Sequence, residues 1–307
     1  MKKVLIATEK PFAGVAVDGI KDIFERAGYE AVLLEKYASA DDLYKSVADA
    51  DALIVRSDKV TAEVVAAAPK LKIVVRAGAG YDNLDLAACS AKGIVAMNTP
   101  GQNSNAVAEL ALGMMVYIAR NCWEPGTGIE LKGKKLGIHA YGNVGKIVAA
   151  LGKGFGMDVY AFDPFVAPEI MKRDGVTPVA DFAELYAVCQ YVSLHIPSNE
   201  QTKRSIGYNL ITSMPKGGTL VNTARKEVID EEGLLKAMRE RNDLKYVTDV
   251  APDALAKIQD SVGKRIFATS KKMGAETAEA NINAGLAAAQ QIVDFFEKGD
   301  KKFQVNK

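Results

Sequence analysis

Short runs rich in Val, Ile and Leu recur along the chain, and helix-compatible stretches such as residues 15–27 and 62–68 separate them. Apolar runs that are continuous rather than alternating are typical of strands in a parallel sheet with helices on both faces. The runs form two series, at residues 4–8, 31–34, 53–56 and 73–75, and at residues 136–139, 159–162, 191–196, 219–222 and 246–250. Two such series predict an α/β protein with two doubly wound parallel-sheet domains.

The two series meet near residues 94–101, where an apolar run leads into Asn-Thr-Pro-Gly. A long helix is predicted next, from Ser104 to about Arg120. Apolar residues lie on most of its sides, which indicates either an internal helix of one subunit or a helix at an interface between subunits. The last predicted helix covers residues 276–298, and Gly299 is a suitable stop for it.

Composition excludes several classes of function. The 39 basic and 38 acidic residues leave a net charge of +1, so we expect neither a nucleic-acid partner nor a membrane partner. Three scattered cysteines, Cys89, Cys122 and Cys189, predict reduced thiols rather than a disulfide framework, and we expect no metal site. No apolar run reaches the roughly 18 residues of a membrane span, and the apolar start is too short for a signal peptide. We therefore expect a soluble, cytoplasmic protein.

A glycine-containing loop after the predicted strand at residues 136–139 points to a dinucleotide. Residues 140–145 match the dinucleotide fingerprint with Ala140 in place of the first glycine, and Gly142 and Gly145 keep the second and third. The next strand ends at Asp163, where a carboxylate can accept hydrogen bonds from ribose hydroxyls. No arginine follows Asp163, so NAD is expected rather than NADP. The alternative is a structural turn that binds no ligand.

Further motifs follow in order along nearly the whole chain, at residues 55–57, 76–83, 98–101, 193–197, 221–225 and 274–280. Together with the glycine loop they resemble the D-2-hydroxyacid dehydrogenases, and within that family most closely the branch that oxidises 3-phospho-D-glycerate. The resemblance implies an NAD-binding Rossmann domain, residues 98–280, inserted in a flavodoxin-like substrate domain, residues 1–97 and 281–307. The chain ends soon after its last helix, so we expect a short form without a regulatory domain and without allosteric inhibition by serine.

The resemblance also implies site residues. The cofactor is expected at Tyr141, Gly142, Asn143, Val144, Gly145, Asp163, His195, Ile196, Pro197, Thr202, Thr223, Ala224, Asp249 and Gly274. The substrate is expected at Arg56, Ser57, Gly78 and Ala79: Arg56 would contact its phosphate, and the backbone N–H groups of Gly78 and Ala79 would meet its carboxylate.

The resemblance assigns Arg225 to the carboxylate and carbonyl oxygen of the substrate, which suits a planar guanidinium that stays charged. The family's catalytic histidine and its partner glutamate are absent, because Lys272 and Ala254 align with them and Asp253 lies one residue early. A carboxylate beside a lysine would raise the already high pKa of that lysine further. The loss of the glutamate is therefore consistent with the replacement of the histidine by Lys272. Lys272 is either the proton acceptor, with a pKa lowered by partial burial and nearby cations, or an anchor for the anion.

His139 and His195 are the only histidines, and we expect both to pack or to lie near the cofactor rather than to transfer protons. The expected function is NAD-dependent oxidation of the 2-hydroxyl of 3-phospho-D-glycerate in serine biosynthesis, by a homodimer. One alternative is a hydroxypyruvate or glyoxylate reductase, which would not depend on a phosphate contact at Arg56. The other is a non-enzymatic NAD-sensing interaction protein, similar to the corepressors of this family.

Overall fold

The computed structural model describes residues 1–306, which divide into two compact units. Unit 1 comprises Met1–Asn103 with Glu276–Lys307, and unit 2 comprises Ser104–Ala275. The chain therefore passes from unit 1 to unit 2 and back, whereas the boundaries expected from sequence lay at residues 97/98 and 280/281. No helix within residues 1–306 is both long and apolar enough to cross a membrane.

Unit 1 contains a sheet of five parallel strands in the order β2-β1-β3-β4-β5. Its elements are β1 (Lys3–Thr8), α1 (Gly14–Arg26), β2 (Glu30–Glu35), α2 (Ala40–Val47), β3 (Ala52–Val55), α3 (Ala62–Ala67), β4 (Ile73–Arg76), α4 (Leu86–Ala91), β5 (Val95–Asn98) and α12 (Ala278–Lys298). This is the flavodoxin-like strand order, in which the chain reverses direction across the sheet between β1 and β3. Ligands of such sheets bind outside the carboxyl ends of the strands at that point.

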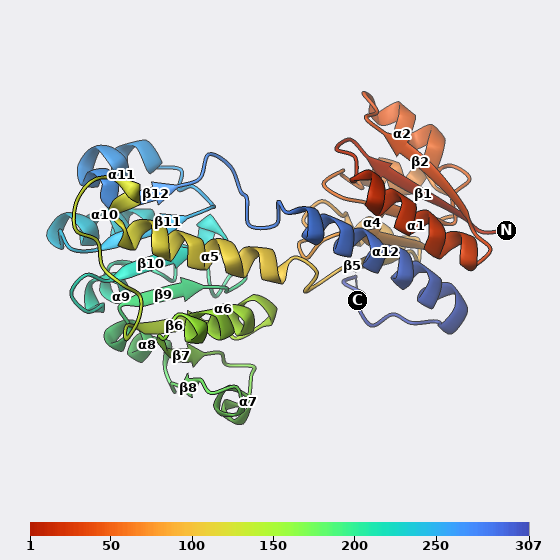
Figure 1. The fold of residues 1–307 in the computed structure, drawn as a ribbon. Helices are drawn as coiled ribbons and strands as arrows, with labels where there is room; N and C mark the ends of the chain where they lie inside the picture. Colours follow the sequence, from red (N-terminus) through yellow and green to blue (C-terminus); the bar gives the residue numbers. More distant parts are fainter. Residues whose placement is uncertain (307) are drawn as a thin grey trace. The chain divides into compact units, whose positions relative to one another are not determined.

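Alternate residues of the unit 1 strands enter two separate cores, as a sheet covered on both faces requires. Val4 and Ile6 of β1 pack with α1 and α12, which lie side by side on one face (Figure 1). Leu5 and Ala7 pack on the other face, with side chains from α2, α3 and α4. Gly285 lets α12 approach closely, because a Cβ there would lie 2.9 Å from Ile20 Cδ1.

Unit 2 contains a sheet of seven parallel strands in the order β12-β11-β10-β9-β6-β7-β8. Its elements are α5 (Ser104–Ala119), η1 (Asn121–Trp123), β6 (Lys135–His139), α6 (Asn143–Gly154), β7 (Asp158–Phe162), α7 (Pro168–Arg173), β8 (Thr177–Pro178), α8 (Phe182–Val188), β9 (Tyr191–Leu194), α9 (Tyr208–Ser213), β10 (Thr219–Asn222), η2 (Lys226–Val228), α10 (Glu231–Glu240), β11 (Lys245–Thr248), α11 (Leu255–Val262), η3 (Gly263–Arg265) and β12 (Ile266–Ala268). The first six strands follow the Rossmann order, and β12 extends the sheet by one strand. Helices α5, α6 and α7 share a core with one face, and α8 to α11 share a core with the other (Figure 1).

The two doubly wound parallel sheets confirm the predicted fold class. Gly299 ends α12 with a φ of 68°, as predicted for its stop. The long helix was predicted to be either internal to one subunit or at an interface between subunits, and most apolar residues of α5 are buried within unit 2. The exposed positions of α5 are Asn105, Glu109 and Gly113.

Candidate functional site

The loop after β6 has the backbone that the glycine pattern predicts. Ala140 adopts a φ of 82°, which an L-residue tolerates at a cost of roughly 1–2 kcal/mol relative to glycine. Gly142 precedes α6 with a φ of −81°, and no atom lies within 4 Å of a Cβ built on it. Gly145 is required by packing, since its Cβ would overlap the carbonyl oxygen of Ala140 and lie 2.9 Å from Ile138 Cγ2. The open side of Gly142 and the N–H groups at the start of α6 together can accept a phosphate group.

The Asp163 carboxylate is hydrogen-bonded to this loop. Its Oδ2 accepts from the N–H of Tyr141 at 2.8 Å, and its Oδ1 accepts from the N–H of Phe165 at 2.8 Å. Each carboxylate oxygen can accept a second hydrogen bond, so ribose hydroxyls remain suitable donors. The side chain of Tyr141 points into the core, where its hydroxyl donates to Asp174 and burial raises its pKa to about 12. Tyr141 can therefore meet a cofactor only through its backbone.

Several expected cofactor residues follow the neighbouring strands β9, β10 and β11, whose carboxyl ends share one edge of the sheet. His195 Nε2, Thr223 Oγ1 and Asp249 Oδ1 are buried atoms without a hydrogen-bond partner within residues 1–306. Buried polar atoms are nearly always hydrogen-bonded, so this edge fits a ligand that carries donors and acceptors along its length. The amide and hydroxyl groups of a nicotinamide dinucleotide meet that description.

Ile196 and Pro197 continue the segment after β9, with Ile196 buried and Pro197 exposed. Thr202 lies further along the same loop. Its hydroxyl donates to the carbonyl of Pro197 at 2.6 Å and accepts from the N–H of Asn199 at 2.9 Å. These bonds give Thr202 a clear role in closing the turn.

The two histidines lie together where β6 and β9 end. The N–H of His195 donates to the carbonyl of His139 at 2.9 Å, and His139 Nδ1 lies 3.1 Å from the hydroxyl of Tyr186. The ring of His139 stacks on Phe182 at 5.5 Å. Burial lowers the pKa of His139 to about 4, and burial together with the nearby charge of His139 lowers the pKa of His195 to about 3. Both rings are therefore uncharged near neutral pH.

Arg225 follows β10 in a loop organised by the Asn222 side chain. Asn222 donates to the carbonyl of Arg225 at 3.0 Å and accepts from the N–H of Ala224 at 3.0 Å. The half-buried guanidinium donates through Nη1 to the carbonyl of Ala224 at 2.9 Å. A guanidinium has five N–H donors, so this bond leaves Arg225 able to bind a carboxylate.

Two carboxylates lie near Ala254, which aligns with the family's glutamate. Asp253 forms an exposed ion pair with Lys226, with 2.5 Å between the charged atoms. Glu231 accepts from the N–H groups of Asp253 and Ala254, at 2.8 Å each, and so holds the start of α11. Both carboxylates are engaged in local structure.

Lys272 lies in the loop between β12 and α12, and Asp249 anchors that loop. Asp249 Oδ2 accepts from the N–H groups of Met273, at 3.2 Å, and Gly274, at 2.7 Å. A buried cofactor-side carboxylate thus holds the two residues that follow Lys272. The side chain of Lys272 is exposed, as is that of Lys271, so the expected partial burial of Lys272 is wrong for this structure.

The remaining expected residues lie at the carboxyl ends of β3 and β4 in unit 1. Arg56 is half-buried and its guanidinium donates to the carbonyls of Lys10 and Pro11, while Ser57 is exposed. Gly78 has a φ of 148°, and a Cβ there would overlap the guanidinium of Arg76.

The carbonyls of Gly78 and Ala79 accept hydrogen bonds from the N–H of Thr99 and the side chain of Asn98, at 3.0 and 2.6 Å. These two bonds hold the loop after β4 in place and orient its backbone.

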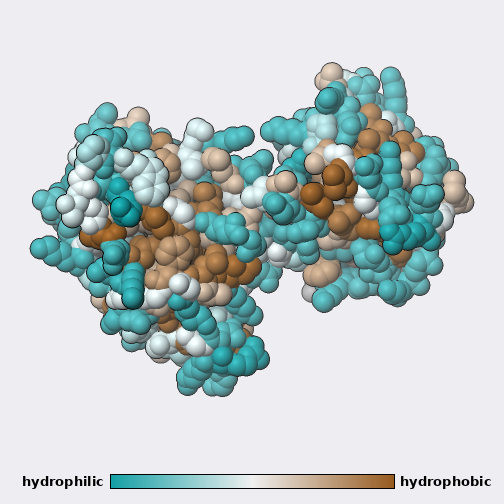
Figure 2. Space-filling model, in the orientation of Figure 1, coloured by the Kyte–Doolittle hydropathy of each residue, from teal (hydrophilic) through white to brown (hydrophobic). Residues whose placement is uncertain are grey.

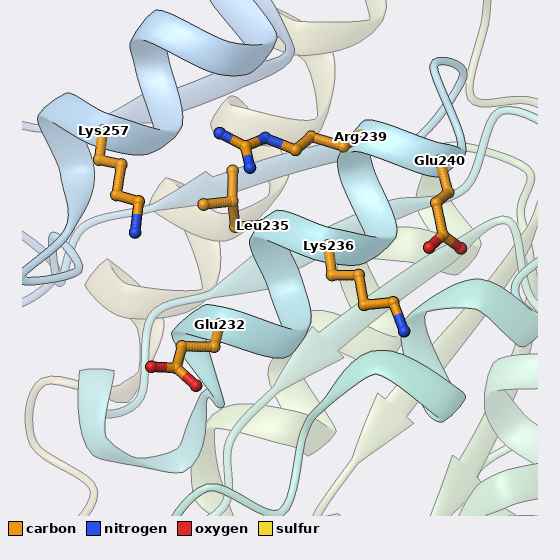
Figure 3. A pocket seen from close by; sticks show the side chains of 6 residues that line it. All are labelled: Glu232, Leu235, Lys236, Arg239, Glu240 and Lys257. Atoms are coloured by element: carbon orange, nitrogen blue, oxygen red, sulfur yellow. The ribbon is translucent and has the colours of Figure 1, made fainter.

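A surface groove of about 340 Å³ lies elsewhere, between α10 and α11 (Figure 3). Its lining residues are Glu232, Leu235, Lys236, Arg239, Glu240 and Lys257. Figure 3 shows Arg239 and Lys257 on the two helices with Leu235 between them. The groove contains none of the residues expected from sequence, and its mixed charges favour no ligand of one sign.

The sequence analysis missed three residues around Arg56. Asp58 and Tyr37 are linked by a hydrogen bond of 2.7 Å, and Asn281 of α12 accepts from the guanidinium of Arg56 at 2.5 Å. Only Asp58 carried a signal, as an acidic residue just after a buried strand.

The sequence and the fold are similar to those of known dehydrogenases. Residues 14–306 match the model of the D-isomer-specific 2-hydroxyacid dehydrogenase catalytic domain. The D-3-phosphoglycerate dehydrogenase of Methanocaldococcus jannaschii is 36% identical over 266 residues, which are 82% of this chain and 51% of the relative. The hydroxypyruvate reductase of Thermotoga maritima is 34% identical over 282 residues, 86% of this chain and 90% of the relative. The chain spans about half the length of the curated phosphoglycerate dehydrogenases that it matches.

Among solved structures, the NAD⁺-bound 3-phosphoglycerate dehydrogenase of Entamoeba histolytica is 52% identical to this chain, with a TM-score of 0.88. That similarity covers 100% of this chain and 99% of the other. D-2-hydroxyisocaproate dehydrogenase shares the fold, with a TM-score of 0.84 at 22% identity.

Proposed function

The chain belongs to the family of D-isomer-specific 2-hydroxyacid dehydrogenases, and we propose that it oxidises 3-phospho-D-glycerate to 3-phosphohydroxypyruvate with NAD as its cofactor. The match over residues 14–306 and the similarity to curated relatives confirm the family identified from the sequence motifs. The observation that carries the proposal is the edge of unit 2, where the glycine loop and the unpartnered polar atoms after β9, β10 and β11 fit a dinucleotide. The proposed reaction is the first step of serine biosynthesis.

The cofactor is NAD, held by unit 2. Bound NAD⁺ would accept the hydride that leaves carbon 2 of the substrate. The start of α6 and Gly142 face its pyrophosphate, and Asp163 accepts from a ribose hydroxyl. The NAD⁺ in the Entamoeba histolytica relative supports this assignment.

Arg225 and Lys272 act on the substrate. Arg225 binds the carboxylate and the oxygen on carbon 2, and its positive charge stabilises the carbonyl as it forms. Lys272 accepts the proton of the 2-hydroxyl at Nζ when it is a neutral amine. Asp249 positions the loop after Lys272 through its bonds to Met273 and Gly274. In the reducing direction the ammonium form of Lys272 donates the same proton.

Unit 1 is the substrate-binding domain of this proposal. Arg56 binds the phosphate of the substrate, with Ser57 beside it, and the N–H groups of Gly78 and Ala79 bind the carboxylate. A phosphate offers several charged oxygens to a guanidinium, which makes that contact charge-assisted. The phosphoglycerate dehydrogenases among the relatives support a phosphorylated substrate.

A second candidate is reduction of hydroxypyruvate, favoured by the Thermotoga maritima relative. A hydroxypyruvate reductase would bind its substrate without a phosphate, so Arg56 would contribute little. A non-enzymatic NAD sensor would bind NAD and turn over no 2-hydroxy acid at all.

We also infer that the protein forms a homodimer through α5. Figure 2 shows apolar residues across the middle of unit 2, in the region of this helix. Gly113 lies on the exposed side of α5 with no atom within 4 Å of its Cβ, although glycine inside a helix costs about 0.5–1 kcal/mol relative to alanine. A second copy that approaches the helix backbone closely would explain that glycine.

NADH formation tests the function across 3-phospho-D-glycerate, D-glycerate and other 2-hydroxy acids, with hydroxypyruvate and NADH for the reverse direction. We expect the highest kcat/KM with 3-phospho-D-glycerate. A higher kcat/KM for hydroxypyruvate would favour the reductase, and binding of NAD without any turnover would favour the sensor.

Variants of Lys272 test the mechanism within the same assay. Lys272→Ala should lower kcat by about 10²–10⁴-fold, and Lys272→Arg should do the same because arginine keeps the charge but releases no proton near neutral pH. Lys271→Ala is the matched control and should stay within about twofold of wild type. A loss confined to KM, with a near-normal kcat for Lys272→Arg, would make Lys272 an anion anchor.

A further inference from the structure

Asp58 is a buried carboxylate that the reaction itself does not use. Its side chain is 3% exposed, and three donors surround it. Oδ1 accepts from the N–H of Glu9 at 2.6 Å and from the hydroxyl of Tyr37 at 2.7 Å, and Oδ2 accepts from the N–H of Arg56 at 3.2 Å. Buried carboxylates are retained where such donors compensate for the lost water.

The Tyr37 hydroxyl is a permanent donor to this carboxylate. Burial is the larger cause, and the hydrogen bond to Asp58 the second, of the rise in the pKa of Tyr37 above its ordinary value. The phenol therefore keeps its proton throughout the range in which an enzyme of this kind works. Tyr37 comes from the segment before α2, so Asp58 joins it to the loops that follow β1 and β3.

These bonds fix the surroundings of the Arg56 side chain. Arg56 Nη1 donates to the carbonyls of Lys10, at 3.2 Å, and Pro11, at 3.1 Å, and both belong to the loop that Asp58 holds through Glu9. The guanidinium also lies 5.2 Å from the centre of the Phe12 ring. Asp58 thus holds the backbone of Arg56 and, through Glu9, the loop whose carbonyls receive its guanidinium.

Tertiary packing brings these segments together at the point where ligands of such sheets bind. Strands β1 and β3 are neighbours in the sheet of unit 1, and the strand order reverses between them. Arg56 Nη2 donates to Asn281 of α12 at 2.5 Å, so three of the five guanidinium N–H groups have partners in the described chain. Two N–H groups remain with which a fixed guanidinium can meet an anion.

We propose that Asp58, together with Tyr37, is a positioning residue that holds Arg56 in the orientation needed to bind the phosphate of the substrate. The inference rests on the proposed function, because it deepens the assignment of that phosphate to Arg56. A flexible arginine loses side-chain entropy when it binds an anion, whereas an arginine held in place has already lost it. Asp58 therefore contributes to affinity for phosphorylated substrates without touching them.

The test measures kcat and KM for 3-phospho-D-glycerate and for D-glycerate, together with the melting temperature. Tyr37→Phe removes one hydrogen bond and should raise KM for the phosphorylated substrate by about 3- to 10-fold, with kcat within about twofold. Asp58→Asn places an amide donor among N–H donors and should raise that KM further. KM for D-glycerate should stay within about twofold in both variants.

Tyr44→Phe is the matched control, because Tyr44 lies on α2, packs against the same core and does not bond to Asp58. It should leave both KM values unchanged. A lower melting temperature with equal changes in KM for both substrates, in Tyr37→Phe and Asp58→Asn, would show a purely structural role and overturn the proposal.

Arg56→Gln separates this inference from the proposed function. If Arg56→Gln removes the preference for the phosphorylated substrate while Tyr37→Phe and Asp58→Asn keep it, only the positioning role is refuted. If Arg56→Gln leaves the preference unchanged, the assignment of the phosphate to Arg56 fails, and the positioning role fails with it.

Discussion

Substitution of Gly142 by alanine separates cofactor binding from folding. No atom lies within 4 Å of a Cβ built on Gly142, and its φ of −81° is available to any L-residue. The residue precedes α6, where alanine is a poorer cap than glycine, but alanine also lowers the entropy of the unfolded chain. The two effects oppose each other, so we expect the free energy of unfolding without nucleotide to change by less than about 1 kcal/mol.

The cofactor should respond very differently. The new methyl group would occupy the open side of the loop, where the pyrophosphate approaches the backbone most closely. Insertion of a methyl group into a packed contact costs about 1–3 kcal/mol. With about 1.4 kcal/mol for each factor of ten, Gly142→Ala should raise the Kd for NAD by about 5- to 150-fold.

Gly145→Ala is the matched comparison within the same loop. Its Cβ would overlap the carbonyl oxygen of Ala140, a backbone atom that cannot move cheaply, and would lie 2.9 Å from Ile138 Cγ2. This variant should therefore lose about 1–3 kcal/mol of stability even without nucleotide. Circular dichroism gives the melting temperatures and isothermal titration calorimetry gives the Kd for NAD. A Gly142→Ala variant that binds NAD within twofold of wild type would refute the placement of the pyrophosphate.

Four shorter predictions concern other features of unit 2. Asp163 should make kcat/KM for NAD at least tenfold higher than for NADP, and Asp163→Asn should reduce that ratio. Equal kcat/KM values for the two cofactors in wild type would contradict the assignment of Asp163 to the ribose hydroxyls. Ala140→Gly should raise the free energy of unfolding by about 0.5–1 kcal/mol, because the strain of alanine at a φ of 82° exceeds the cost of the entropy that glycine adds to the unfolded chain. A lower free energy of unfolding for Ala140→Gly, measured by urea denaturation, would argue against strain. Light scattering at micromolar concentration should show a dimer for wild type and a monomer for Gly113→Leu, and a monomeric wild type would exclude the interface. Burial lowers the pKa of His139 to about 4, so between about pH 6.5 and 4 this histidine is protonated in the unfolded chain but not in the native protein. The free energy of unfolding should therefore fall by roughly 3 kcal/mol over that range because of this group. The fall should be shallower in His139→Gln.

Local patterns were sufficient for the architecture. Strands that are buried on both faces need continuous apolar runs, and each run that we used is a strand of one of the two parallel sheets. Short elements with few apolar residues, such as β8 and α9, were not predicted, because their conformation depends on the neighbours against which they pack. The glycine loop was recognisable for the same local reason: a tight turn and a close helix restrict the residues at Gly142 and Gly145 themselves.

The sequence by itself thus determined the fold class, the family and the residue types of the dinucleotide loop, since each follows from short apolar runs and motifs taken in their order along the chain. Only the tertiary structure decided which distant residues meet. Asn281 reaches Arg56 across 225 residues of chain because α12 returns to unit 1, and Asp58 meets Glu9 because β1 and β3 are neighbours. It also decided that Lys272 is exposed. Such contacts depend on the order of strands and the packing of whole layers, which no window of neighbouring residues contains.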